Sequence, residues 1–171
     1  DLFGSLILNG TSTFNVESSG VVNLLDGDIT LRSDSTLNLD SFAEVNLGGT
    51  GRLVSIDTSA LNIKDSLLFI NAQEFSMEDN SEVKVTSNGN IVVAGGFLNL
   101  RDSSDLQITD GIIDVTGKDL SVLDTATLTL TGTSALLKVD GGDVNLSDTG
   151  SAVVNSGAKF LITSGASVCF Y

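Results

Sequence analysis

The strongest constraint on the fold of this 171-residue chain is a short repeat of apolar residues. Apolar residues come in pairs separated by one residue, and turn residues lie between consecutive pairs. Alternation with period two is typical of a strand with one buried face, and no segment shows the spacing of an amphipathic helix. The sequence therefore predicts 22 short strands and almost no helix, with the first apolar residues of the strands at Leu6, Phe14, Val22, Ile29, Leu37, Val45, Leu53, Leu61, Leu68, Phe75, Val83, Ile91, Leu98, Leu106, Ile113, Leu120, Leu128, Leu137, Val144, Val153, Phe160 and Val168.

A longer period indicates how these strands are arranged. Every third strand tends to carry an additional apolar residue, and the first buried positions of this class are 22, 45, 68, 91, 113, 137 and 160. A period near 23 residues with three strands is what a three-sided, right-handed parallel β-solenoid requires. We therefore expect an all-β fold with a single domain, residues 1–171, and about seven coils. A two-sided coil is the alternative, but it does not explain the pattern at every third strand.

Composition excludes several classes of function. The chain has no His and one Cys, so it lacks the residues for a Ser-His-Asp or Cys-His nucleophile, an imidazole metal site or a zinc cluster. A net charge of −14 disfavours nucleic acid and anionic membranes. Apolar runs such as residues 66–70 are too short to span a bilayer. We therefore expect no cofactor, no metal, no nucleic-acid partner and no membrane insertion.

The three strand classes differ in the side chains that they turn outward. One class has polar residues at the outward position, such as Asn15, Asn38 and Asn62, and a second class is mixed. The third class turns apolar residues outward, and an exposed apolar patch marks an interaction surface. We expect lateral association there, unless a turn or a terminal segment covers the patch or shifts of register hide some members. The predicted apolar stripe consists of Val21, Leu67, Phe69, Val92, Ile112, Leu136 and Leu161.

The ends of the chain carry a second prediction. Solenoids normally protect their terminal coils, because an open coil presents unpaired backbone groups. Here the strand pattern begins almost at Asp1 and continues to Tyr171. Either the chain is cut from a longer solenoid, or neighbouring subunits stack end to end as in cross-β fibrils. Cys169 is expected to face outward and is a candidate for an intermolecular disulfide, the alternative being an inert thiol.

Two groups of charged residues raise the question of catalysis. Paired carboxylates such as Asp26 and Asp28 could hold Ca²⁺ or act as general acid and base on a glycoside, but Asp is also an ordinary turn residue. Arg32, Arg52 and Arg101 could supply the base of a solenoid polysaccharide lyase. Arg32 and Arg101 are expected three coils apart, so we do not expect them to share a site. The sequence predicts that the protein is not an enzyme.

The apolar pairs with a central Asn, as in Phe14-Asn15-Val16, Leu37-Asn38-Leu39 and Val45-Asn46-Leu47, resemble the coils of secreted prokaryotic β-solenoid surface proteins. Autotransporter and filamentous-haemagglutinin passengers belong to this class. The resemblance covers nearly the whole chain, and it is architectural. The short, acidic, His-free and Pro-free chain with a terminal Cys also resembles the amyloid-like proteins that build tubular sheaths of certain methanogenic archaea. That resemblance implies a sheath subunit joined by β-stacking and disulfides.

These observations favour a structural, extracellular protein that assembles with copies of itself at the cell surface. The chain begins with Asp1 and shows no basic-then-apolar leader, so we expect a processed mature chain or an excised fragment of an exported protein. Other components of the cell envelope are further candidate partners. An adhesin or passenger module that binds a host or glycan ligand is the alternative function. A solenoid polysaccharide lyase or hydrolase is the third.

Overall fold

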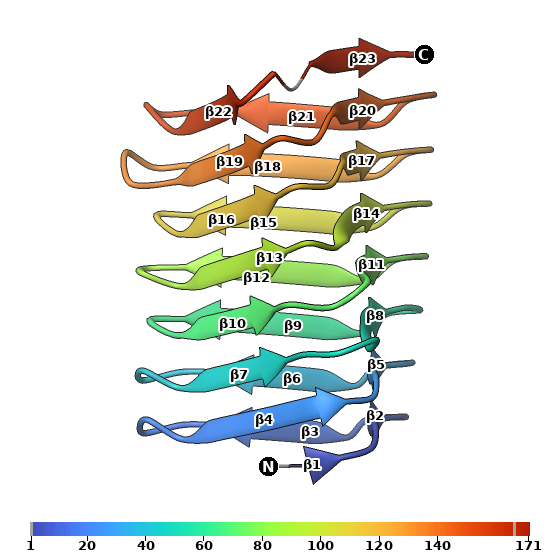
Figure 1. The fold of residues 1–171 in the computed structure, drawn as a ribbon, viewed down its shortest axis with the longest axis vertical. Coiled ribbons are helices and arrows are strands. Elements are labelled where there is room, and N and C mark those ends of the chain that lie inside the picture. Colours follow the sequence, from blue (N-terminus) through green and yellow to red (C-terminus); the bar gives the residue numbers. More distant parts are fainter. Residues whose placement is uncertain (1, 166) are drawn as a thin grey trace.

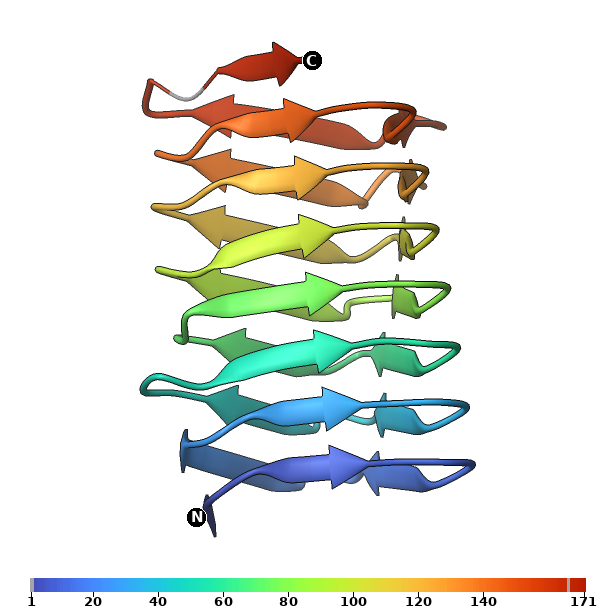
Figure 2. The same ribbon diagram turned by 90° about the vertical axis from the view of Figure 1, so that its right-hand side faces the viewer.

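The computed structural model describes residues 2–165 and 167–171, which form an all-β solenoid. Figure 1 shows the chain rising from the N-terminus at the bottom to the C-terminus at the top, and Figure 2 shows the same stack of coils from the side. In Figure 1 the near strands run from left to right and the far strands return from right to left. This path makes the coil right-handed, as the sequence predicts. In the described part, no helix has the length and hydropathy needed to cross a bilayer.

Three parallel sheets form the three sides of the solenoid. Sheet A contains β1 (Leu2–Phe3), β4 (Val21–Asp26), β7 (Glu44–Leu47), β10 (Leu67–Ile70), β13 (Asn90–Ala94), β16 (Ile112–Thr116), β19 (Leu136–Asp140) and β22 (Lys159–Thr163). Sheet B contains β2 (Leu6–Leu8), β5 (Ile29–Leu31), β8 (Arg52–Ser55), β11 (Glu74–Met77), β14 (Phe97–Leu100), β17 (Leu120–Val122), β20 (Val144–Leu146) and β23 (Val168–Phe170). Sheet C contains β3 (Thr13–Val16), β6 (Thr36–Leu39), β9 (Ala60–Lys64), β12 (Glu82–Thr86), β15 (Asp105–Thr109), β18 (Thr127–Thr131) and β21 (Ser151–Val154).

The pairing register confirms the predicted period. Each strand pairs with the strand three places further along the chain, so that Val83 lies between Leu61 and Leu106 in sheet C. The solenoid has about 7 turns of about 23 residues, and the two-sided alternative is excluded by the third sheet. The 22 predicted strands are present, together with β1, whose two residues are too few to show an apolar pair.

The core is a stack of inward-facing aliphatic side chains. Residues that pair across coils are buried together, and Phe75 packs fully buried between its strand partners Leu53 and Leu98. One predicted core position is wrong. Ala152 pairs with Leu128 and packs against the core, whereas Val153 occupies the outward position and is 43% exposed. The alternation pattern predicts that the larger residue, Val153, is buried, but the pairing register places its smaller neighbour Ala152 at the inward position.

The corners of the coil require residues that accept a positive φ. Among the described residues, fifteen that are not Gly have positive φ, and all of them except Phe42 are Asp or Ser. Their short polar side chains can hydrogen-bond to nearby backbone, which lowers the cost of the left-handed conformation. At Gly142 the constraint is steric instead, because an added Cβ would collide with the carbonyl oxygen of Lys118 in the coil below.

Candidate functional site

The predicted apolar stripe is not continuous. Its seven residues do occupy outward positions of sheet A, but the register divides them between two columns with polar residues among them. The first column reads Val21, Glu44, Leu67, Asn90, Ile112, Leu136 and Lys159. The second reads Asn23, Asn46, Phe69, Val92, Asp114, Lys138 and Leu161.

The physical reason lies in the pleat of the strands. The extra apolar residue precedes the inward pair in some strands and falls between its members in others, so the extra residues stand in different columns. Lys138 forms ion pairs of 3.5 Å with Asp114 and 3.3 Å with Asp140 on this face, between Val92 and Leu161 of the second column. Val21 and Leu161 are about half exposed, at 57% and 46%, but they lie near opposite ends of the sheet. Sheet A therefore presents separate small apolar patches.

The two ends of the solenoid expose strand edges and apolar side chains. At the C-terminal end the edge strands are β21, β22 and β23, and at the N-terminal end they are β1, β2 and β3. These six strands contain a single charged residue, Lys159. Val168 and Phe170 occupy inward positions of β23, yet they are 41% and 77% exposed because no described residue covers the last coil. The edge strands at both ends therefore present unpaired backbone groups and mostly apolar side chains, with Lys159 as their one charged residue.

Cys169 lies in β23 opposite Asn145, at an outward position of sheet B. Its thiol is free in this chain and partly exposed. The hydrogen bond with Cys169 raises the pKa of the Tyr171 hydroxyl above its ordinary value of 10.0. The thiol therefore stands at the rim of the open C-terminal end, where a second chain could reach it.

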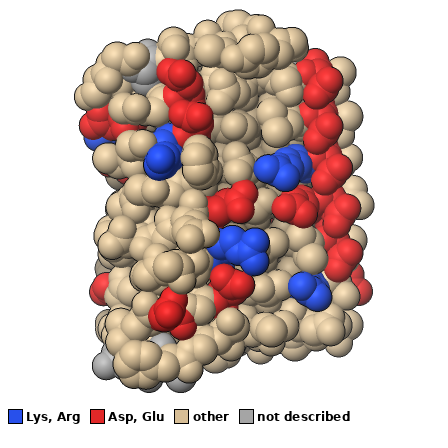
Figure 3. All heavy atoms as spheres, turned by 45° about the vertical axis from the view of Figure 1, so that its right-hand side comes forward, with Lys and Arg blue, Asp and Glu red and all other residues tan. Residues whose placement is uncertain are grey.

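Carboxylates form a ladder along the corner between sheets B and C, and we call it the Asp ladder. Its members are Asp57, Asp79, Asp102, Asp124 and Asp148, one per coil, and all have φ between 57° and 61°. The backbone N–H of Asp57 donates to the carboxylate of Asp79 at 3.3 Å, and that of Asp79 donates to Asp102 at 3.3 Å. Figure 3 shows acidic side chains in a nearly unbroken column along one edge of the molecule. This ladder gives the side of the solenoid a strong negative charge.

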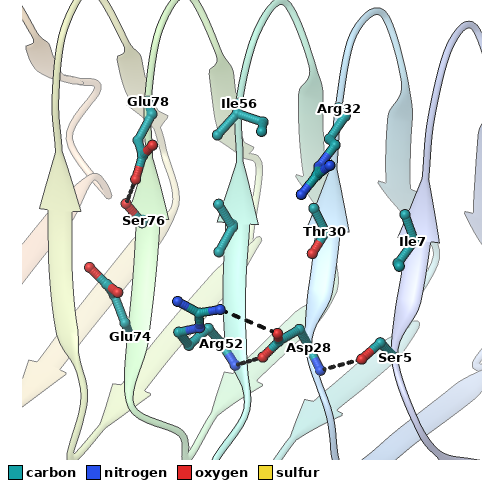
Figure 4. Close-up of a pocket in the computed structure, with 11 residues that line it drawn as sticks. Ser5, Ile7, Asp28, Thr30, Arg32, Arg52, Ile56, Glu74, Ser76 and Glu78 are labelled. Atoms are coloured by element: carbon teal, nitrogen blue, oxygen red, sulfur yellow. Dashed lines mark hydrogen bonds and ion pairs between the residues drawn. The ribbon is translucent and has the colours of Figure 1, made fainter.

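Beside the Asp ladder, the outer face of sheet B is hollowed into a trough of about 410 Å³ that crosses β2, β5, β8 and β11. Its floor consists of four side chains at outward positions, Ile7, Thr30, Val54 and Ser76, of which the last three are short. Ser76 is only 1% exposed although it points away from the core. Longer side chains on both rims stand above the floor, and they create the hollow (Figure 4).

Charged residues of both signs line the two rims. On the rim next to sheet A, Arg52 forms an ion pair with Asp28 at 3.5 Å, and Glu74 follows in the next coil. On the rim next to sheet C, Arg32 and Glu78 lie on either side of Ile56 (Figure 4). Glu78 accepts a hydrogen bond of 2.8 Å from the hydroxyl of Ser76, and Glu74 accepts one of 2.7 Å from the amide of Asn99.

Arg32 and Arg52 line the trough, and Arg101 lies on the same face of the solenoid beyond its end. Arg101 follows β14 as Arg32 follows β5, so it continues the same rim, one coil beyond Glu78. The expectation that Arg32 and Arg101 would not share a site holds for direct contact, since three coils separate them, but both belong to one elongated surface. Only the pairing register could reveal this, because Arg52 precedes its apolar pair whereas Arg32 and Arg101 follow theirs.

The acidic corner residues do not form a metal centre. Among residues 2–165 and 167–171, no three His, Cys, Asp or Glu side chains are placed so that they could hold a metal ion. Asp26 and Asp28 instead accept hydrogen bonds from the next coil, from Thr50 at 2.9 Å and from the backbone N–H of Arg52 at 2.8 Å. These carboxylates stabilise turns. No family model, curated protein or solved structure matches the chain.

Proposed function

We propose that this chain is a non-catalytic structural protein of the cell exterior that polymerises by stacking its solenoid end to end. The observation that carries the proposal is the character of the two end surfaces. Each presents the edges of three sheets, and the six edge strands carry one charge among them. Proteins usually protect such edges with charges, Pro or a covering segment, because unpaired strands template further pairing. Here the next pairing partner is proposed to be a coil of a second copy.

The distribution of charge supports axial growth over lateral growth. The sides of the solenoid carry the Asp ladder and most of the net charge of −14, so parallel solenoids repel one another. The ends carry exposed apolar side chains such as Phe170 instead, whose burial favours contact. Lateral apolar contacts, if they form, involve the small patches of sheet A such as Phe69 with Val92. The extracellular location rests on the resemblance of the coils to secreted surface proteins.

Electron microscopy and sedimentation of the purified chain test the proposal. We expect filaments one solenoid wide whose mass increases with protein concentration. Introducing charge at the C-terminal edge with Val168→Asp and Phe170→Asp should abolish them while the circular dichroism of the β-solenoid is retained. Thr129→Asp on the outer face of sheet C is the matched control and should leave filaments intact. A monodisperse monomer at high concentration of the unaltered chain would overturn the proposal.

A further inference from the structure

We propose that the trough on sheet B binds a linear, uncharged polysaccharide that lies along the solenoid axis. This binding site goes beyond the proposed assembly, because it lies on the side of the solenoid and involves neither end. Three features of the trough favour such a ligand: its shape, the chemistry of its rims and its charge balance.

The shape suits an extended ligand. The trough crosses four coils, whose spacing of about 4.8 Å gives it a length of roughly 14 Å. Its floor lies below the rims because Thr30 and Ser76 have short side chains, and Val54 adds an apolar surface between them. A ligand here can therefore follow several coils in succession. Because sheet B continues beyond β11 in the same register, a longer chain can extend toward Phe97, whose ring flanks the next coil.

The rims offer both hydrogen-bond donors and hydrogen-bond acceptors. Guanidinium groups donate in a planar fork, and carboxylates accept through two oxygens, so that both can engage neighbouring hydroxyls of a sugar. Among the described residues, the guanidinium of Arg32 has no ion pair, and one carboxylate oxygen each of Glu74 and Glu78 makes no hydrogen bond. Hydroxyls both donate and accept, which matches rims that alternate between the two roles.

The charge balance favours an uncharged ligand. Within the trough, the three carboxylates of Asp28, Glu74 and Glu78 stand beside the two guanidiniums of Arg32 and Arg52, so its lining carries a charge of −1. Arg101 continues the rim one coil beyond and balances this charge, in a protein whose net charge is −14. An anionic polymer would lie beside the carboxylates and the Asp ladder, and a cationic peptide would lie beside the guanidiniums. A second copy of this chain would have to present a thin ridge to fill a concave face, whereas a single polysaccharide chain fits without rearrangement.

Titration of the full 171-residue chain with defined oligosaccharides, followed by NMR of the backbone amides, tests this inference. The probes are cellohexaose, mannohexaose and chitohexaose, their disaccharides, and hexagalacturonate as the anionic counterpart. We expect at least one neutral hexasaccharide to shift amides of β5, β8 and β11, and to bind about tenfold more tightly than its disaccharide, which contacts fewer coils. The amides of sheet C should not shift.

Two variants locate the site, each with a matched control. Arg52→Ala removes a rim donor and should weaken binding about tenfold, which corresponds to about 1.4 kcal/mol. Lys64→Ala breaks the comparable surface ion pair with Asp40 on sheet C and should change affinity less than twofold. Val54→Trp fills the trough and should abolish binding, whereas Gln107→Trp on the outer face of sheet C should not.

Three results would overturn the inference. The first is that none of the neutral hexasaccharides shifts the trough amides. The second is tighter binding of hexagalacturonate that weakens with salt, which would identify an anionic ligand. The third is loss of self-association in Arg52→Ala or Val54→Trp, which would make the trough a contact between copies of the protein. The filament assay of the unaltered chain does not depend on any of these results.

Discussion

The Asp ladder makes the sharpest prediction about how this solenoid balances stability against charge. Asp79 stands between Asp57 and Asp102, one coil away on each side. At a coil spacing of about 4.8 Å, two unit charges in water repel by about 0.9 kcal/mol, so two neighbours destabilise the charged state of the coil by roughly 1.7 kcal/mol before screening. At 0.01 M salt the Debye length is about 30 Å, much longer than the coil spacing, so most of this repulsion remains. At 1 M salt the Debye length is about 3 Å, so most of the repulsion is screened.

Asp79→Asn removes one charge and keeps both an acceptor for the N–H of Asp57 and a side chain that tolerates the left-handed backbone. We expect the free energy of unfolding to rise by about 1 to 1.5 kcal/mol at 0.01 M salt and by no more than about 0.3 kcal/mol at 1 M. Asp79→Ala loses the acceptor and places a Cβ-bearing residue without a polar side chain at φ 57°, so it should be less stable than Asp79→Asn by about 2 kcal/mol.

Urea denaturation at the two salt concentrations, followed by circular dichroism, measures these differences, and urea is required because guanidinium chloride would itself screen the ladder. Asp34→Asn is the matched control. Asp34 accepts a hydrogen bond from Thr58 at the same corner but has no carboxylate above it in its column, so its substitution should show little dependence on salt. If Asp79→Asn destabilised the protein equally at both salt concentrations, the ladder would not be a source of repulsion and the reasoning would be refuted.

Three further outcomes follow from the core, the C-terminal coil and the thiol. Phe75→Ala should lower the free energy of unfolding by about 3 to 5 kcal/mol in urea denaturation, because the ring is fully buried between two coils; a loss below about 1 kcal/mol would contradict this packing. Hydrogen bonds from the hydroxyl and the N–H of Ser167 hold the pKa of Asp143 below its ordinary 3.8. These hydrogen bonds therefore stabilise the folded state fully above pH 3.8, and the stabilisation is lost as the pH falls through the lowered pKa. In an acid titration followed by NMR, β23 should lose its native signals before the central coils do, and Asp143→Asn should remove this early step. Cys169 should give a disulfide-linked dimer on non-reducing electrophoresis, and Cys169→Ser should not; a monomer under oxidising conditions would contradict its exposure at the open end.

The repeat made the fold accessible to sequence reasoning because one rule applies at every coil. An inward pair such as Leu61 and Ile63 is fixed by alternation, and the 23-residue period then determines which strands pair. Outward residues obey no such rule. Leu67 precedes the inward pair of its strand and Val92 falls between the members of its pair, so the two side chains lie in different columns. Burial fixes which residues face inward, but it does not constrain where apolar residues stand on the exposed side.

The trough was missed for a related reason. Arg52 begins its strand whereas Arg32 and Arg101 directly follow theirs, and only the stacked coils bring the three to one face. The burial of Ser76 is equally hidden in the sequence, because Ser76 occupies an outward position of its strand and yet is only 1% exposed. The inward residues of a solenoid can therefore be predicted from the sequence of each coil, whereas its surface features depend on how successive coils stack.

The numbers of strands set a geometric condition on axial assembly. Sheets A and B contain 8 strands each and sheet C contains 7, so the described residues form 23 strands, one fewer than a multiple of three. If β1 of one copy pairs with β22 of the next and β2 pairs with β23, then one strand position between β21 and β3 stays empty at each joint. The joint then leaves the inward residues Val154 and Val16 facing a gap one strand wide. In the proposed axial assembly of residues 1–171, two sheets would therefore hold each joint, and the gap in sheet C is the position where an added strand would strengthen the joint most.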